Sequence, residues 1–139
     1  MEAYEVSFSS ELYRIRGVVQ EIMNYLLHNV PNLTEEDRFD IRLIFSELLC
    51  NAVVHGNRED VAKRVNVVVE IAKDVIFARI TDEGPGFDYI QLLTGLNDGD
   101  RGGESGRGMR LVYSLTDSVA FNQYGNQITF YKRVKIRHG

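Results

Sequence analysis

The chain has 139 residues, of which 44% are hydrophobic and 26% are charged. This length and composition are typical of one globular domain with its own core, and they argue against long disordered segments. The formal net charge of −4 argues against a general binder of nucleic acids, although a local basic loop remains possible. The apolar runs fall well short of the roughly eighteen residues that cross a bilayer, so no membrane insertion is expected.

Cys50 is the single cysteine, so the chain cannot form an internal disulfide. This favours a reducing, cytoplasmic setting. A catalytic thiol at Cys50 is possible, but its apolar neighbours favour a packed and inert side chain. Residues 1–6 have neither the basic start nor the apolar run of a signal peptide.

The N-terminal part predicts a strand followed by a helix. Residues 4–9 alternate polar and apolar side chains, which is typical of a short strand. Ser9 or Ser10 can then cap a helix, because apolar residues recur at spacings of three and four until about Asn29. Pro31 is expected to end this helix.

A second helix is predicted from the start signal of Thr34 with Asp37 three residues later. It is expected to run to Gly56, which suits a left-handed C-terminal cap. Glu47, Asn51 and His55 recur in it at four-residue steps, so they form one polar line on the helix.

This polar line has two interpretations. It could be a solvated stripe that keeps the helix soluble. Alternatively, the carboxylate of Glu47 could act as a general base beside a hard cation such as Mg²⁺ that is bound by the amide of Asn51. The two interpretations are equally compatible with the line by itself.

Two strands are predicted next, over residues 64–72 and 75–81, joined by a short hairpin. Residues 94–106 are rich in glycine and cannot pack as a strand or a helix, so they form either a functional lid or a disordered segment. Helical spacing resumes over residues 108–115.

The last two strands are predicted over residues 118–123 and 127–134, with the turn at 125–126. The whole order predicts an α/β two-layer sandwich with a mixed, mostly antiparallel sheet covered on one face by three helices. We expect one domain over residues 1–139. This order argues against a doubly wound sheet and against a Rossmann-type use of the glycines.

Residues 82–87 follow directly after a hydrophobic strand. A carboxylate at that position, Asp82, can accept a hydrogen bond from an amine such as the exocyclic amine of adenine, and Gly84 and Gly86 let the backbone lie close to a flat ligand. A plain acidic turn is the alternative, and taken alone it is the better interpretation.

Residues 102–109 open a helix with small residues and unpaired backbone N–H groups, which attract anions. Arg101, Arg107 and Arg110 add positive charge suited to phosphate. The segment lacks the Gly-Lys-Ser/Thr of a Walker A loop. A flexible linker is the alternative, but the arginines favour a phosphate site.

The three segments together carry a resemblance. Residues 47–56 resemble the N box, residues 82–87 the G1 box and residues 105–109 the G2 box of the GHKL (Bergerat-fold) ATPases. Within these, the chain is similar to the bacterial anti-sigma factor serine/threonine kinases, over roughly residues 8–132. The family pattern often has a glycine where Arg110 stands. It also has a threonine near the last hairpin, a place that Asn126 or Thr129 would fill.

The resemblance implies roles for the motif residues. Asn51 would ligate Mg²⁺, Glu47 would be the general base or position the attacking hydroxyl, and Asp82 would bind the adenine amine. Arg107, with Arg101 as the alternative, would neutralise charge on the γ-phosphoryl group. His55 would have a structural role. The implied ATP-binding residues are Asn51, Asp82, Gly84, Gly86, Gly103, Ser105, Gly106, Arg107, Gly108 and Met109, with an ATP lid at about residues 94–106.

The function that the resemblance implies is an anti-sigma factor that uses ATP and Mg²⁺ to phosphorylate a Ser or Thr of its antagonist protein. A sigma factor would be the alternative partner, and a homodimer is expected. The other possibility is a partner-binding regulatory module with little or no phosphotransfer, which the Arg110 departure favours. A piece of a histidine kinase is disfavoured, since no phosphoacceptor helix pair precedes the domain.

Overall fold

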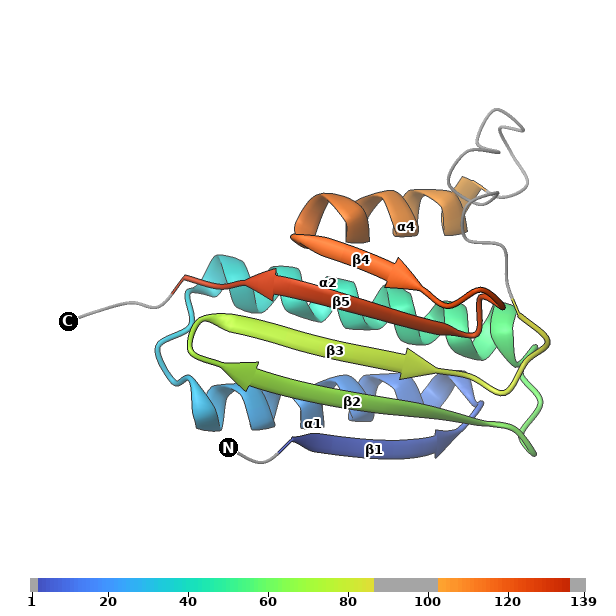
Figure 1. The fold of residues 1–139 in the computed structure, drawn as a ribbon. Coiled ribbons are helices and arrows are strands. Elements are labelled where there is room, and N and C mark those ends of the chain that lie inside the picture. The colour runs from blue at the N-terminus through green and yellow to red at the C-terminus, as the bar shows by residue number, and fades with distance from the viewer. Residues whose placement is uncertain (1–2, 87–102, 136–139) are drawn as a thin grey trace.

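The computed structural model describes residues 3–86 and 103–135, with only the backbone described for residues 103–107. One layer is a five-stranded sheet in the order β1-β2-β3-β5-β4, and the other holds the helices (Figure 1). The elements are β1 (Tyr4–Ser9), α1 (Leu12–Asn29), α2 (Glu35–Asn51), η1 (Ala52–Gly56), β2 (Arg64–Ala72), β3 (Val75–Thr81), α4 (Gly103–Leu115), β4 (Ser118–Phe121) and β5 (Gln127–Arg133).

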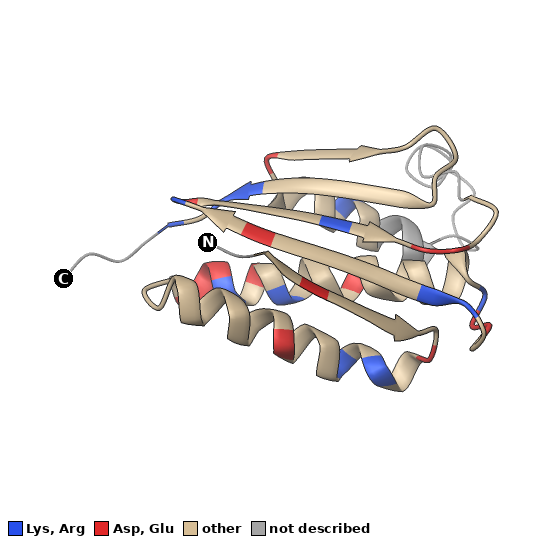
Figure 2. Cartoon of the chain, turned by 60° about the horizontal axis from the view of Figure 1, so that its bottom comes forward, with Lys and Arg blue, Asp and Glu red and all other residues tan. Residues whose placement is uncertain are grey.

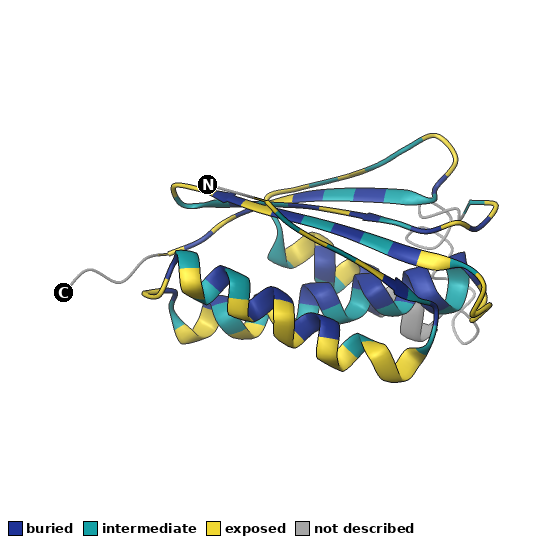
Figure 3. Ribbon diagram, turned by 90° about the horizontal axis from the view of Figure 1, so that it is seen from below, coloured by how far each residue is buried: buried dark blue, intermediate teal, exposed yellow. Residues whose placement is uncertain are grey.

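The predicted α/β two-layer sandwich is confirmed. Helices α1, α2 and α4 lie on one side of the sheet, and the other side of the sheet is open (Figure 3). Every strand pair that the structure describes is antiparallel, so the parallel pair of a mixed sheet is not among them. Tight turns account for two of these pairs, β2–β3 at Lys73-Asp74 and β4–β5, because a tight turn reverses the chain. The pairs β1–β2 and β3–β5 are joined through helices.

Strand alternation builds the core between the layers. In β5, Ile128 and Phe130 are buried against the helices, whereas Thr129 and Tyr131 belong to the open face. The Phe130 ring meets the Phe45 ring of α2 edge-on, with 5.4 Å between the ring centroids. These contacts fix α2 against the middle of the sheet.

The two helix starts differ in how far the sequence predicted them. Thr34 caps α2 as expected, its hydroxyl accepting from the Asp37 N–H at 3.1 Å. The expectation that Ser9 or Ser10 caps α1 is wrong, since α1 begins after an extended Glu11 with no side-chain cap. The Ser10 hydroxyl instead donates to the Lys63 carbonyl at 2.7 Å, and the Ser9 hydroxyl donates to Glu11. A tertiary contact therefore replaces the cap.

The end of α2 is also different from the prediction. The α-helix ends at Asn51 and continues as the π-helical turn η1 over Ala52–Gly56. Gly56 does not have the left-handed conformation of a cap, which is found later at Arg58 (φ 52°) and Glu59 (φ 57°). Single π-turns in α-helices are frequent at functional sites.

The C-terminal elements begin and end at slightly different residues than predicted. Helix α4 begins at Gly103 rather than at residue 108, so part of the predicted lid is helical. The rest of that predicted segment, residues 94–102, lies outside the described residues. Strand β4 ends at Phe121, because Asn122 turns the chain by accepting from the N–H groups of Gly125 at 2.8 Å and Asn126 at 3.1 Å. Strand β5 ends at Arg133.

Charged side chains are interspersed in sign along the helices and strands (Figure 2). The Arg133–Asp74 pair, at 3.7 Å, is exposed and contributes little to stability. The Lys132–Asp37 pair is different, since its side chains are only 9% and 6% exposed. Among the described helices, none has the length and apolar character needed to span a membrane.

Candidate functional site

The first and third motifs meet at Glu47 and Gly108. Glu47 lies in the last turns of α2 and is half-buried. A Cβ atom placed on Gly108 of α4 would lie 2.0 Å from Glu47 Oε2 and 2.8 Å from its Cδ. A side chain at this position would displace the carboxylate, so glycine leaves the space in which Glu47 now lies.

The first and second motifs meet at Gly56 and Asp82. Asp82 follows β3 and is only 4% exposed. A Cβ atom on Gly56 would lie 2.3 Å from Asp82 Oδ2, and one on Gly84 would lie 1.9 Å from the Gly56 carbonyl oxygen. The three residues therefore pack with no space for a methyl group. This contact explains the glycine at 56 better than a helix cap does.

Asp82 is held by backbone contacts at the rim of the sheet. Its Oδ1 accepts from the Gly84 N–H at 2.8 Å, and its own N–H donates to the Asn126 carbonyl at 2.9 Å. Burial raises the pKa of Asp82, while the Gly84 N–H and the positive charge of Lys63 oppose that rise. A ligand that donates a hydrogen bond here would stabilise the ionised carboxylate.

Asn51 carries an unsatisfied polar group. The residue is 3% exposed, and its Nδ2 is the one buried side-chain nitrogen or oxygen atom in the described part of the chain that lacks a hydrogen-bond partner. Leaving such a group unpaired costs about 1–3 kcal/mol. The amide lies one helical turn after Glu47, and its unpaired Nδ2 is a donor, so a ligand with an acceptor oxygen, such as a phosphate, would complete the hydrogen bonding at this end of α2.

The residues fit a magnesium ion that arrives with a polyphosphate. Over residues 3–86 and 103–135, no group of three or more His, Cys, Asp or Glu side chains could hold a metal ion. Mg²⁺ commonly takes one or two protein oxygens, with substrate phosphates and waters as its other ligands. An amide oxygen from Asn51 would satisfy that requirement.

Asn57 is a site residue that the sequence reasoning missed. It is 1% exposed, and its Nδ2 donates to Ser10 Oγ at 2.7 Å and to the Arg64 carbonyl at 2.9 Å. Its Oδ1 accepts from the Glu83 N–H at 2.8 Å, which holds the loop after Asp82. A buried amide directly after a helix-ending glycine was the available signal, but its three partners are far apart in the sequence.

Gly84 and Gly86 have reasons within the chain to be glycine. Gly86 has φ 111°, and a Cβ atom on it would lie 1.9 Å from the Tyr124 carbonyl oxygen in the β4–β5 turn. Gly84 lies against Gly56, as described above. Their expected contact with a purine stays a prediction.

The remaining predicted residues are placed as follows. Met109 is fully buried in the hydrophobic core, so only its backbone is available to a ligand. Burial lowers the pKa of the half-buried His55, which favours the neutral imidazole. Thr129 lies on the open face of the sheet, away from the helices, which leaves Asn126 as the residue beside Asp82.

The other residues of the third motif are described less completely. The backbone of Gly103, Ser105, Gly106 and Arg107 is helical, but their side chains lie outside the described residues, as does Arg101. Arg110 is exposed. The placement of α4 nevertheless directs its N-terminal half towards Glu47, through Gly108.

Comparison with known proteins assigns the family. Residues 8–132 match the sequence profile of the histidine kinase-like ATPase domain. The chain belongs to this family. It is also 31% identical over 110 residues to the serine-protein kinase RsbW of Staphylococcus aureus strains MSSA476, MW2 and JH9, which covers 73% of this chain and 69% of each relative. The resemblance stated from the three boxes is thereby confirmed.

Proposed function

We propose that this histidine kinase-like ATPase domain is an ATP- and Mg²⁺-dependent serine/threonine protein kinase. The observation that carries the proposal is the buried Asn51, whose Nδ2 has no hydrogen-bond partner, one turn from Glu47 at the point where Gly108 brings α4 against that carboxylate. The Nδ2 donor would bind a phosphate oxygen, the Asn51 amide oxygen would ligate the metal, and Glu47 would be the base beside a helix start that attracts phosphate.

The proposed nucleotide contacts follow the three motifs. Asp82 would accept a hydrogen bond from the adenine amine, which its burial and its place at the sheet rim support. The backbone N–H groups at the N-terminal half of α4 would bind the phosphates. Asn51 would hold the Mg²⁺ ion, which when bound neutralises phosphate charge.

The chain's own part in phosphoryl transfer would be to orient and deprotonate the acceptor. The Glu47 carboxylate would accept the proton of the Ser or Thr hydroxyl as its oxygen bonds to the γ-phosphorus, while the bond to the β-phosphate oxygen breaks and ADP leaves. Arg107 would stabilise the charge on the transferring group.

The proposed protein partners are an anti-sigma factor antagonist, which would be the phosphoacceptor, and a sigma factor, which this chain would sequester. Support comes from the likeness to proteins named serine-protein kinase RsbW and from the resemblance to anti-sigma factor kinases. Phosphorylation adds charge at an interface, so it would switch the chain between the two partners. A homodimer in the cytoplasm completes the proposal.

The direct test is incubation with labelled ATP, Mg²⁺ and a candidate antagonist protein. We expect label on a Ser or Thr of the antagonist, lost with Glu47→Ala and with removal of Mg²⁺. The absence of transfer by the wild-type chain, with nucleotide saturating, would refute the kinase proposal.

A partner-binding module without useful phosphotransfer is the second candidate. The exposed Arg110, where the family pattern often has glycine, favours it. On this hypothesis the purified chain retains its partner equally well with and without nucleotide, and Glu47→Ala behaves as wild type. Nucleotide-dependent retention would exclude it.

A further inference from the structure

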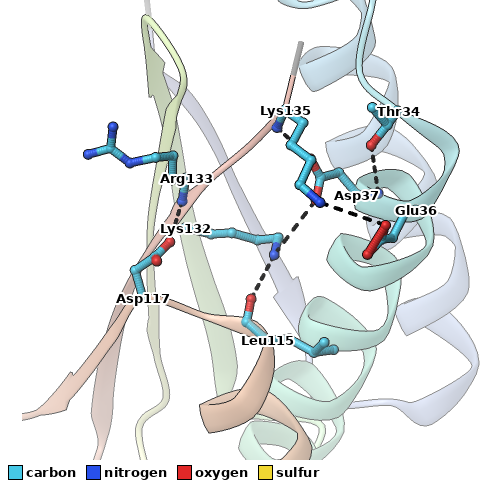
Figure 4. A network of polar contacts seen from close by, with 8 residues as sticks. All are labelled: Thr34, Glu36, Asp37, Leu115, Asp117, Lys132, Arg133 and Lys135. Atoms are coloured by element: carbon cyan, nitrogen blue, oxygen red, sulfur yellow. Dashed lines mark hydrogen bonds and ion pairs between the residues drawn. The ribbon is translucent and has the colours of Figure 1, made fainter. Parts of the chain in front are cut away.

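A buried ion pair joins three elements at the end of the helical layer away from Glu47. The Nζ atom of Lys132, on β5, lies 3.9 Å from Oδ1 of Asp37 in the first turn of α2. The same ammonium donates to the carbonyl of Leu115, the last residue of α4, at 2.7 Å (Figure 4). One charged group therefore touches both helices from the sheet.

The partners of Lys132 are themselves held in place. Oδ2 of Asp37 accepts from the Lys135 N–H at 2.6 Å, and the Asp37 N–H donates to the Thr34 hydroxyl. The ammonium lies between a carboxylate and the negative end of the α4 dipole, both of which favour its charge. Since the side chains of Lys132 and Asp37 are almost fully buried, loss of either would leave an uncompensated charge.

The geometry links this ion pair to the candidate site. Helix α2 runs from Asp37 towards Glu47, about ten residues or roughly 15 Å along its axis. Helix α4 runs the other way, from Gly108 beside Glu47 to Leu115 beside Lys132. The two antiparallel helices are therefore joined at one end by the Lys132 bridge and touch at the other end at the candidate site.

We propose that Lys132 and Asp37 are positioning residues that set α4 along α2 and so keep the Gly108 backbone against Glu47. The contact at Gly108 is close, because a Cβ atom there would lie 2.0 Å from the carboxylate and would make the Glu47 side chain move. A displacement of about 1 Å at reacting groups can lower a rate on the order of 100-fold. The effect on turnover rests on the proposed function, while the effect on α4 does not.

The test compares three variants of the full chain. Lys132→Met has similar length but cannot donate or carry charge, and Lys132→Arg keeps both properties. Arg133→Met is the matched control, because it removes the neighbouring cation of β5, whose ion pair with Asp74 is exposed. Hydrogen exchange of the amides of residues 108–115 is measured for each variant, together with the kcat and KM for phosphotransfer from Mg·ATP to the antagonist protein.

We expect Lys132→Met to speed exchange across residues 108–115 and to lower kcat, each by about tenfold or more, with strands β1 to β3 unchanged. Lys132→Arg should restore both to within about threefold of wild type, because it can still bridge Leu115 and Asp37. Exchange and kcat for Lys132→Met equal to those for Arg133→Met would overturn the proposal.

A second control separates positioning from general loss of stability. Ile71→Ala removes a core contact in β2 and is studied at a temperature where its unfolded fraction equals that of Lys132→Met. An equal loss of kcat in both would overturn the positioning role. Should the wild-type chain show no turnover at all, the proposed function fails, and the exchange of α4 amides alone decides whether Lys132 positions that helix.

Discussion

Two buried asparagines near the end of α2 illustrate at the residue scale how a binding group differs from a structural one. Asn57 has partners for both atoms of its amide, whereas the Nδ2 atom of Asn51 has none. Both residues are almost completely buried. The difference supports a structural role for Asn57 and the proposed ligand-binding role for Asn51.

This difference predicts opposite effects of the same substitution. Asn51→Ala should change the free energy of unfolding of the ligand-free chain by less than about 1 kcal/mol, because it removes an unpaired group. Asn57→Ala should lower it by about 2–4 kcal/mol, because the hydrogen-bonding groups of Ser10, Arg64 and Glu83 would lose their partner. Urea denaturation measures both. Mg²⁺-dependent nucleotide binding should be lost in Asn51→Ala, and a large destabilisation by that variant would contradict the assignment.

The pKa of Asp82 predicts a dependence of stability on pH. Because burial raises that pKa in the folded chain, the folded state holds this proton more tightly than the unfolded state. The stability that Asp82 contributes is present below its ordinary pKa and is lost as the pH rises through the raised value. Asp82→Asn should therefore gain stability relative to wild type as the pH is raised from about 4 towards neutral, in urea denaturation without nucleotide. A constant difference in the free energy of unfolding between variant and wild type across this range would contradict the raised pKa of Asp82.

At the scale of elements, the close contact of α4 with α2 depends on a residue without a side chain. Gly108 lies against Glu47, while Gly17 in the middle of α1 has nothing within 4 Å of where a Cβ atom would be. The two helical glycines thus share backbone conformation but not surroundings. Only the first has a packing reason to be glycine.

These glycines form a matched pair for mutation. Gly17→Ala should raise the free energy of unfolding by about 0.5–1 kcal/mol, because alanine has the better helix propensity. Gly108→Ala should change it by less than about 1 kcal/mol, because the end of the Glu47 side chain can move aside, but should abolish phosphotransfer by displacing the Glu47 carboxylate. Thermal denaturation and the labelled-ATP assay measure the two effects. Wild-type activity in Gly108→Ala would show that the contact is not needed.

At the scale of the whole molecule, the candidate site is assembled from three segments that only the fold brings together. Glu47 and Asn51 come from α2, Asp82 from the end of β3, and Gly108 from α4. Gly56 and Gly108 provide the two close contacts between them. Nucleotide binding should therefore stabilise the chain as a unit.

We predict that Mg·ATP raises the melting temperature and that GTP does not. Binding stabilises the folded chain by about 2.7 kcal/mol at 100 times the Kd. GTP has a carbonyl where adenine has its amine, which would face the Asp82 carboxylate unfavourably. Differential scanning calorimetry measures the shift. Equal shifts with ATP and GTP would contradict the role of Asp82 as the adenine contact.

Much of the fold could be predicted from the sequence, because its signals are local. Alternation of apolar residues predicted β2 and β3 with the bounds that the structure has, and Thr34 with Asp37 predicted the start of α2. Glu47, Asn51 and Asp82 were also chosen from local spacing and motif patterns, and their roles stay predictions. The spacing of apolar residues and the residues that cap helices depend on neighbours within one or two turns. Both can therefore be recognised in the sequence without knowing the fold.

The remaining features depend on contacts between residues far apart in the chain. No local pattern shows that Gly56 packs against Asp82, that Asn57 joins Ser10 to Glu83, or that Lys132 bridges α2 and α4. Such contacts are set by strand order and by how closely the layers pack, which no local propensity encodes. The amino-acid sequence by itself determined which residues could carry the chemistry. The tertiary structure decided which of them meet, because burial and close backbone approach exist only once the sheet and helices are packed.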